Sequence, residues 1–189
     1  MGGFFGAITK QDCVLDVFFG TDYHSHLGTK RGGMAVYDRK DGFQRQIHNI
    51  ENTPFRTKFE RDLADFHGCS GIGCISDTDP QPLLVRSHLG LYAISTVGII
   101  NNADELIQTY FSDHGHQFMA MSSGRVNATE LAAALINQKD DLVSGILHAQ
   151  EMIQAPSPCS FSPSGARSSP ARDRLGRLPV LIGKKRRGC

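Results

Sequence analysis

The sequence predicts a single α+β domain, and three kinds of local pattern support this fold class. Short apolar runs framed by glycines, at 2–8 and 71–75, are typical of buried strands. The Asp41-Gly42 pair, between two strand-like runs, predicts a tight hairpin. Three segments after residue 100 have apolar residues at helical spacing, and each begins with a capping residue. At 189 residues the chain is long enough to bury a substantial core.

The composition is that of an ordinary globular protein. It is 40% hydrophobic and 21% charged, and its net charge of +1 gives no electrostatic reason to expect nucleic acid or an anionic membrane as a partner. No apolar stretch approaches the roughly 20 residues that a membrane helix needs. Neither a secretory signal nor a regular cysteine spacing is present. We therefore expect a cytoplasmic protein with reduced thiols, which binds neither nucleic acid nor membrane.

The first half of the chain predicts strands and two helices. Residues 11–19 carry apolar side chains at helical spacing, with Asp12 as the expected cap. The polar, Gly-rich stretch at 23–33 predicts a loop. The remaining elements expected in this half are strands at 34–37, 43–47 and 71–75 and a helix at 54–66.

The second half predicts a hairpin and three helices. The hairpin would consist of strands at 91–94 and 97–100. Capping-box pairs, Asn102 with Glu105 and Asn127 with Glu130, predict the first two helix starts. Either Asp140 or Asp141 should start the third helix, which would run to about residue 153.

The character of the chain changes after residue 154. Residues 155–172 contain four prolines and six serines, and proline cannot donate a ladder hydrogen bond, so we do not expect a central strand here. We interpret 155–170 as either a local reading-frame error or a disordered insertion. An ordered pattern returns at 171–183, including a strand after Pro179, and the basic run at 184–187 predicts a solvated terminus.

Several motifs resemble the glutaminase domain of the amidophosphoribosyltransferases, which are class II glutamine amidotransferases. The start at 2–6 resembles that family's Cys-Gly-(Ile/Phe)-Phe-Gly, and 26–36 is similar to its His-Arg-Gly-Gln-(Asp/Glu)-Ser-Ala-Gly-Ile-Ala-Val. Residues 172–179 resemble its Arg-Asp-x-x-Gly-x-x-Pro segment. The resemblance covers about 1–154 and 171–183. It implies a four-layer αββα sandwich of the N-terminal-nucleophile hydrolase type.

In that family the domain hydrolyses glutamine and passes ammonia to a second domain, which aminates phosphoribosyl pyrophosphate. A thiolate attacks the amide with the terminal amine as its base, and two donors form an oxyanion hole. An arginine binds the substrate carboxylate bidentately, and an acidic residue holds the substrate ammonium. The glutaminase site therefore needs four side-chain functions.

All four functions are replaced in this chain, if the resemblance is followed position by position. Gly2 stands at the nucleophile position, and Ser76 stands where the arginine belongs. Val97 replaces the oxyanion asparagine, so the backbone amide of Gly98 is the one donor that remains there. Ala128 replaces the acidic residue. The resemblance thus implies a degenerate site with no catalytic residue, and it leaves any ligand of that site open.

Histidine pairs offer a second kind of candidate site. His24 with His26 and His114 with His116 each supply two imidazoles, but a metal site needs three or four ligands. The simpler expectation is loop histidines that face water, with no metal.

Two cysteines and one charged pair complete the candidates. Cys13 is expected in the core, and Cys74 occupies a strand at the family's histidine position. Arg172 and Asp173 would form a structural ion pair or contact a ligand, and the ion pair is the preferred interpretation.

The resemblance implies the amino-terminal part of an amidophosphoribosyltransferase-like protein of purine nucleotide biosynthesis. We expect three parts: the degenerate amidotransferase domain at 1–154, the aberrant or disordered segment at 155–170, and the end of the same domain at 171–189. The chain would then end before any phosphoribosyltransferase domain. Mg²⁺ and phosphoribosyl pyrophosphate would belong to that absent domain, and no cofactor is expected here. The partner would be that C-terminal domain or a second copy in a homo-oligomer. Three roles remain open: a scaffold for ammonia-dependent transfer, a regulatory small-molecule site, or an interaction module.

Overall fold

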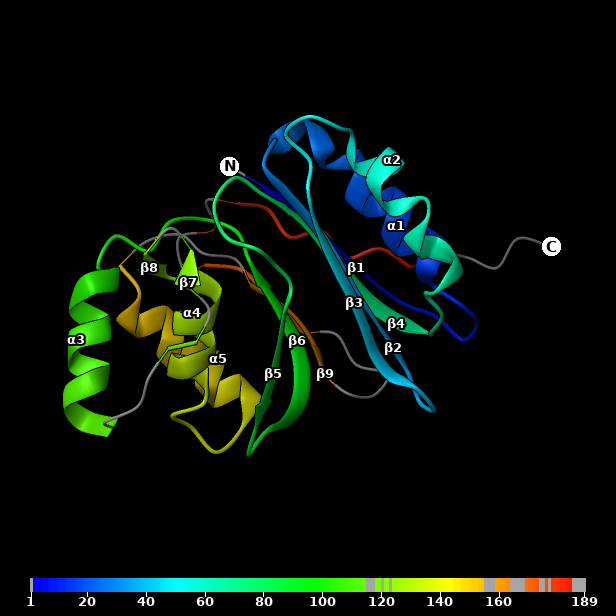
Figure 1. Ribbon diagram of the computed structural model, residues 1–189. Helices are drawn as coiled ribbons and strands as arrows, with labels where there is room; N and C mark the ends of the chain where they lie inside the picture. The colour runs from blue at the N-terminus through cyan, green and yellow to red at the C-terminus, as the bar shows by residue number, and fades with distance from the viewer. Residues whose placement is uncertain are drawn as a thin grey trace.

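Two four-stranded antiparallel sheets form the centre of the computed structural model, which describes residues 2–114, 118–119, 121–122, 124–154, 159–163, 169–173, 176 and 178–184 (Figure 1). Sheet A has the strand order β1-β4-β2-β3, and sheet B has the order β10-β9-β6-β5. The strands of sheet A are β1 (Gly3–Ile8), β2 (Arg31–Asp38), β3 (Gly42–Asn49) and β4 (Ser70–Ser76). The strands of sheet B are β5 (Leu83–Ser87), β6 (Gly90–Thr96), β9 (Cys159–Pro163) and β10 (Ser169–Ala171). A separate small pair joins β7 (Met121–Ser122) to β8 (Arg125–Val126).

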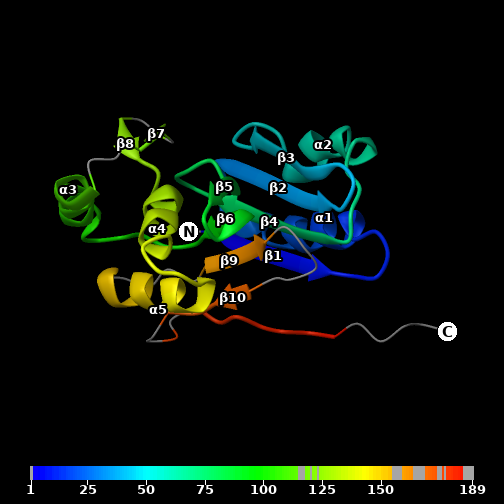
Figure 2. The same cartoon turned by 90° about the horizontal axis from the view of Figure 1, so that it is seen from below.

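Helices lie on the outer side of each sheet. Figure 1 shows α1 (Val14–Tyr23) and α2 (Phe55–Phe59) on sheet A. On the side of sheet B lie α4 (Ala128–Ile136) and α5 (Leu142–Met152), with α3 (Ala103–His114) farther out (Figures 1 and 2). None of the helices within the described residues is long and apolar enough to cross a membrane.

The apolar core is divided by the two sheets. All seven residues of β4 are buried, because this central strand is covered on both faces, and this explains its continuous apolar run. Between the sheets, Ala35 and Ile72 of sheet A form a small cluster with Ala93 of sheet B. Ala35 and Ala93 bring a small side chain from each sheet to this contact.

Each helical layer closes a larger cluster of its own. On sheet A, the rings of Phe18, Phe55 and Phe59 stack in sequence, with centroid distances of 5.8 and 4.3 Å. On sheet B, Leu131, Leu135 and Ile136 of α4 pack with buried residues of β6. The apolar stripes predicted from helical spacing are therefore the faces that cover the sheets.

The strands predicted in the first half are confirmed, and so is the hairpin at Asp41-Gly42. Strand β2 pairs with β3 in a register that sets Asp38 opposite Gly42, whose φ is +78°. Strand β2 begins at Arg31, inside the stretch expected to be a loop. The expected helix at 54–66 is shorter: α2 ends at Phe59, and a 3₁₀ turn follows at Asp62–Ala64.

The hairpin expected from 91–94 and 97–100 is wrong in its second strand. Strand β6 covers 91–94, but its hairpin partner is the preceding strand β5, which the sequence analysis missed. Because β6 is paired with β5 on one edge and β9 on the other, the chain leaves the sheet after Thr96. Residues 97–100 form no strand; Ile100 is buried and Ile99 is 70% exposed.

The expectation that 155–172 contains no central strand is also wrong. Strand β9 lies between β10 and β6 in sheet B. Its only proline, Pro163, is its last residue, and Pro170 lies in the edge strand β10, where a missing N–H is tolerated. Residues 180–184, the described part of the chain after Pro179, form no strand, contrary to expectation. The basic run beyond Lys184 lies outside the described residues.

Side-chain caps fix two of the predicted helix starts. Asn127 Oδ1 accepts the N–H of Thr129 at 2.8 Å, and Asp141 Oδ1 accepts those of Val143 and Ser144. Asp12, as expected, accepts the N–H of Val14 at the start of α1. The side chain of Asn102 bonds to the end of α5 instead of capping α3: its Nδ2 donates to the carbonyl oxygen of Met152, and its Oδ1 accepts the N–H of Gln154.

Replacing Asn127 with alanine should destabilise the fold markedly. The Asn127 side chain is fully buried, and its Nδ2 also donates to the carbonyl oxygen of Pro80 at 3.2 Å. Losing the cap and this second bond should lower the free energy of unfolding by about 2–3 kcal/mol. Urea denaturation measures the change. The exposed Asn52→Ala variant is the matched control and should differ from the parent by less than about 0.5 kcal/mol; equal losses in both would contradict the assignment.

Candidate functional site

Gly2 and Ser76 meet at one end of sheet A. The register that pairs Gly3 with Ile75 sets Gly2 beside the end of β4. A Cβ atom on Gly2 would lie 3.4 Å from the Cα of Ser76, but only 2.2 Å from the carbonyl oxygen of Ile75. Backbone therefore occupies the space that a side chain at position 2 would need.

Ser76 is buried, and its hydroxyl serves a local turn. Its Oγ accepts the N–H of Thr78 at 3.2 Å and lies 3.4 Å from the Thr78 hydroxyl. One hydroxyl with these partners cannot hold a carboxylate by two parallel bonds, as a guanidinium does. Arg31 lies opposite Ser76 in the β2–β4 register.

Val97 and Gly98 follow the last residue of β6. Val97 is buried, whereas Gly98 is exposed and has a φ of +135°. Thr96, just before them, makes a 2.7 Å hydroxyl–hydroxyl bond to Thr129 of α4. This bond brings the end of β6 next to Ala128, so these predicted positions also lie together.

Ala128 is the first residue of α4, and a carboxylate from another segment lies against it. Its N–H donates to Asp79 Oδ2 at 3.2 Å. Asp79 belongs to the connection between β4 and β5, and the partly positive helix start favours its charge. Sequence reasoning missed Asp79, because only the fold brings it to residue 128.

The connection at 77–82 joins the two halves of this candidate site. At the sheet A end, Asp77 Oδ1 accepts the N–H of Thr29 at 2.7 Å. At the sheet B end, the buried Gln81 accepts the N–H of Thr96 at 2.7 Å. Asp79 and Pro80 also bond to the start of α4. Because of these contacts, the five positions predicted from the resemblance lie around one connection: Gly2, Ser76, Val97, Gly98 and Ala128.

His24 and His26 do not complete a metal site within the described residues. His26 is exposed as expected, but His24 lies against β1, where a Cβ on Gly3 would be 2.9 Å from its Nδ1. This Nδ1 is buried and has no hydrogen-bond partner among the described residues. Burial, together with the nearby His26, lowers the pKa of His24. The second expected pair cannot be assessed, because His116 lies outside the described residues.

Cys13 and Cys74 are both core residues, as the sequence predicted for Cys13. Each is 1% exposed, and burial raises the pKa of each thiol to about 12. Both thiols are therefore protonated at neutral pH and are poor nucleophiles. The carbonyl oxygen of Arg172 accepts a bond from Gln150 Nε2 of α5, and Asp173 is buried. The ion pair between Arg172 and Asp173 stays a prediction.

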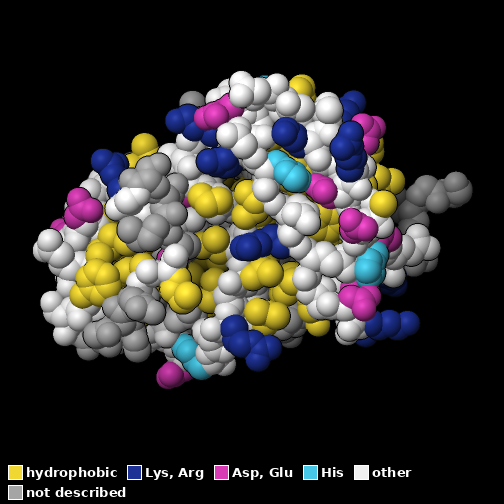
Figure 3. All heavy atoms as spheres, viewed as in Figure 1, with side chains coloured by type: hydrophobic (Ala, Val, Ile, Leu, Met, Phe, Trp, Pro, Cys, Tyr) yellow, Lys and Arg dark blue, Asp and Glu magenta, His cyan; other side chains and the backbone are white. Residues whose placement is uncertain are grey.

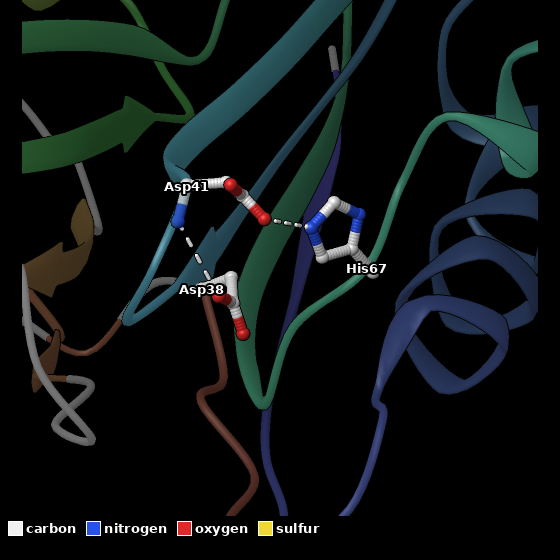
Figure 4. Close-up of side chains that lie close together, drawn as sticks. All are labelled: Asp38, Asp41 and His67. Carbon is white, nitrogen blue, oxygen red and sulfur yellow. Dashed lines mark hydrogen bonds and ion pairs between the residues drawn. The ribbon is translucent and has the colours of Figure 1, made fainter.

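A cluster that the sequence did not predict lies at the opposite end of β2. Asp38, Asp41 and His67 each offer one ligand atom, and these atoms lie within 4.8 Å of one another (Figure 4). The Asp38-x-x-Asp41 spacing was visible in the sequence, but nothing local pointed to His67.

Comparisons with known proteins identify the fold. No family model matches the sequence, and no curated protein matches it significantly. Among solved structures, the glutamine phosphoribosylpyrophosphate amidotransferase from B. subtilis, complexed with ADP and GMP, superimposes with a TM-score of 0.72 over 87% of this chain at 21% identity. A structure described as the allosteric regulatory enzyme of purine biosynthesis gives a TM-score of 0.71 over 87% of this chain at 20% identity.

The likeness is one of fold. It supports the expected glutaminase-domain fold, with its mixture of helices and antiparallel sheets. This chain spans 35% and 36% of the two solved structures, about a third of their length.

Alkaline pH should lower the free energy of unfolding. Burial raises the pKa of Cys13, Cys74 and Tyr92 to about 12 in the native state. Below about pH 8 both states hold these protons, but between about pH 8 and 12 the unfolded chain releases them first, so stability falls as pH rises. Urea denaturation at about pH 8 and about pH 10.5 measures the slope. Cys74→Ala should reduce it, and an unchanged slope would contradict this assignment.

Proposed function

We propose that this chain is the amino-terminal part of an amidophosphoribosyltransferase-like protein of purine nucleotide biosynthesis, with an inactive glutaminase half that acts as a scaffold. Its fold would be the four-layer αββα sandwich of the N-terminal-nucleophile hydrolases. The likeness to two solved structures and the sequence motifs support the family part of this proposal. The geometry at Gly2 supports the inactive part.

The observation that carries the proposal is the position of Gly2. It has no side chain to attack an amide, and the Ile75 carbonyl oxygen lies 2.2 Å from where its Cβ would be. A nucleophile therefore cannot be supplied by a simple substitution, since the backbone of β4 must move to make room. Removal of one oxyanion donor alone costs about 10²–10³ in rate, and removal of the nucleophile abolishes the covalent route.

The replaced positions have roles in packing and turn formation. Ser76 closes a turn, Val97 is buried, and the N–H of Ala128 bonds to Asp79. These uses fit a scaffold, because they stabilise the fold without presenting groups to a substrate. In the whole protein, the partner would be a C-terminal phosphoribosyltransferase domain, which would bind Mg²⁺ and phosphoribosyl pyrophosphate, or a second copy. Scattered cysteines favour a cytoplasmic setting.

Two observations favour alternative roles. Nδ1 of His24, which lies beside β1 and has no hydrogen-bond partner in the described part of the chain, favours a small-molecule site at the emptied end of sheet A. On the outer face of α1, Leu15, Phe19 and Tyr23 form an exposed stripe at a spacing of four residues, which favours an interaction module. A melting temperature that rises and saturates with a nucleotide or amino acid would support the small-molecule site. Co-purification with a Cys-containing homologue would support the interaction module.

Restoring a cysteine at position 2 should not restore glutaminase activity. Gly2→Cys should lower the free energy of unfolding by about 1–3 kcal/mol, because its Cβ overlaps backbone. Gly183→Cys is the matched control: no atom lies within 4 Å of a Cβ there, and the change should be below about 0.5 kcal/mol. Glutamate release from glutamine and urea denaturation are measured for both. Enzymatic glutamate release by the parent chain, with Gly2 confirmed by mass spectrometry, would refute the proposal.

A longer natural protein that contains this chain and a transferase domain should use ammonia but not glutamine. The reason is that the transferase reaction needs only the ammonia that the glutaminase site would otherwise supply. Phosphoribosylamine formation from phosphoribosyl pyrophosphate is measured with ammonium salts and with glutamine. Inactivity with both would contradict the scaffold role, and activity with glutamine would contradict the inactive site.

A further inference from the structure

Asp38, Asp41 and His67 converge from two segments at the far end of sheet A. Asp38 ends β2 and Asp41 immediately precedes β3, so both belong to one turn. The β2–β4 register pairs Tyr37 with Ser70, which brings the chain before β4, with His67, alongside this turn. Figure 4 shows the two carboxylates and the imidazole gathered there.

Contacts of the backbone at residues 67 and 68 fix the position of His67. The next residue, Gly68, has a φ of +151°, and a Cβ there would be 2.4 Å from the carbonyl oxygen of Tyr37. Only glycine allows this approach. The N–H of Gly68 donates to Asp12 Oδ2 at 2.9 Å, and that of His67 donates to Gln44 Oε1 at 2.7 Å. The backbone at His67 is therefore held beside the turn independently of the contact of its imidazole with Asp41, and Gln44 Nε2 also lies 3.2 and 3.1 Å from the two ring nitrogens.

The donor atoms are also oriented. Asp38 Oδ1 accepts the N–H groups of Lys40 and Asp41, at 2.7 and 3.4 Å, which leaves Oδ2 as its ligand atom. Asp41 Oδ2 lies 2.6 Å from His67 Nε2. The cations of the same turn, Arg39 and Lys40, are exposed. Figure 3 shows charged and histidine side chains gathered on this side of the molecule, whereas hydrophobic ones gather over sheet B.

We propose that Asp38, Asp41 and His67 bind one divalent transition-metal ion of the Zn²⁺ or Co²⁺ class, with water completing the coordination. The three ligand atoms lie within 4.8 Å of one another. Tetrahedral bonds of about 2.0–2.2 Å to nitrogen and oxygen hold ligand atoms about 3.4 Å apart, so side-chain rotations can bring these three atoms to that spacing. An imidazole favours this class over Mg²⁺ or Ca²⁺, which prefer oxygen ligands alone.

The bound ion would act as a structural clip. It would replace the Asp41–His67 hydrogen bond and join the β2–β3 turn to the segment that enters β4. This role goes beyond the proposed function and does not depend on it, because the cluster lies at the opposite end of the strands from Gly2 and Ser76.

Titration of the chelator-treated full chain with Co²⁺ tests the proposal. We expect one equivalent to bind by calorimetry, a Tm that rises with Co²⁺ concentration, and a visible spectrum without thiolate-to-cobalt charge transfer, which excludes cysteine ligands. His67→Gln and Asp41→Asn should each weaken binding by about tenfold or more. His26→Gln, which removes an exposed loop histidine, is the matched control and should bind as the parent does.

Three results would overturn the proposal: no saturable binding, equal affinity in His67→Gln and the parent, or a spectrum with thiolate ligation. Circular dichroism without metal checks that each variant is folded. If His67→Gln does not fold, Asp38→Asn takes its place, since Asp38 is at the turn surface and its loss should weaken Co²⁺ binding by a similar factor.

Discussion

The connection at 77–82, between β4 and β5, is the constraint on which the rest of the structure depends. It is the covalent link between the sheets, and its polar groups are bonded at each end, to Thr29 beside sheet A and to Thr96 of sheet B. The carbonyl oxygen of Gln81 lies where a Cβ on Gly33 would be, so the connection is pressed against β2. With Asp79 and Pro80 bonded to the start of α4, the connection fixes how the strand ends meet.

The same constraint explains how the candidate site keeps its shape. No catalytic side chain is needed to hold these segments together, because the bonds that join them come from the connection and the caps. Because Gly2 has no side chain, the backbone of β4 lies close to it, as the contact at Ile75 illustrates. Packing of this kind would let the fold persist without glutaminase chemistry, as the proposed function requires.

Local signals predicted part of this arrangement, and long-range pairing decided the rest. Asp41-Gly42, Asn127 and Asp141 act through hydrogen bonds and turns within a few residues, so the sequence reveals them. The hairpin of β5 and β6 was missed because Pro80 and Pro82 obscure the start of β5. The central position of β9, and the approach of Asp79 and His67 to their partners, depend on sheet register, which no local pattern encodes.

The order of strands in sheet B also bears on biosynthesis. Strand β6 can complete its pairing only after β9 is synthesised, since Thr96 pairs with Cys159. The described residues between these two strands include the helices α3, α4 and α5. Until the ribosome has delivered that late segment, one edge of β6 presents free N–H and C=O groups. Sheet A, by contrast, draws all its strands from the first 76 residues and can assemble early. We infer that a nascent chain is most prone to aggregate during this interval, and that its slowest folding step is closure of the second sheet.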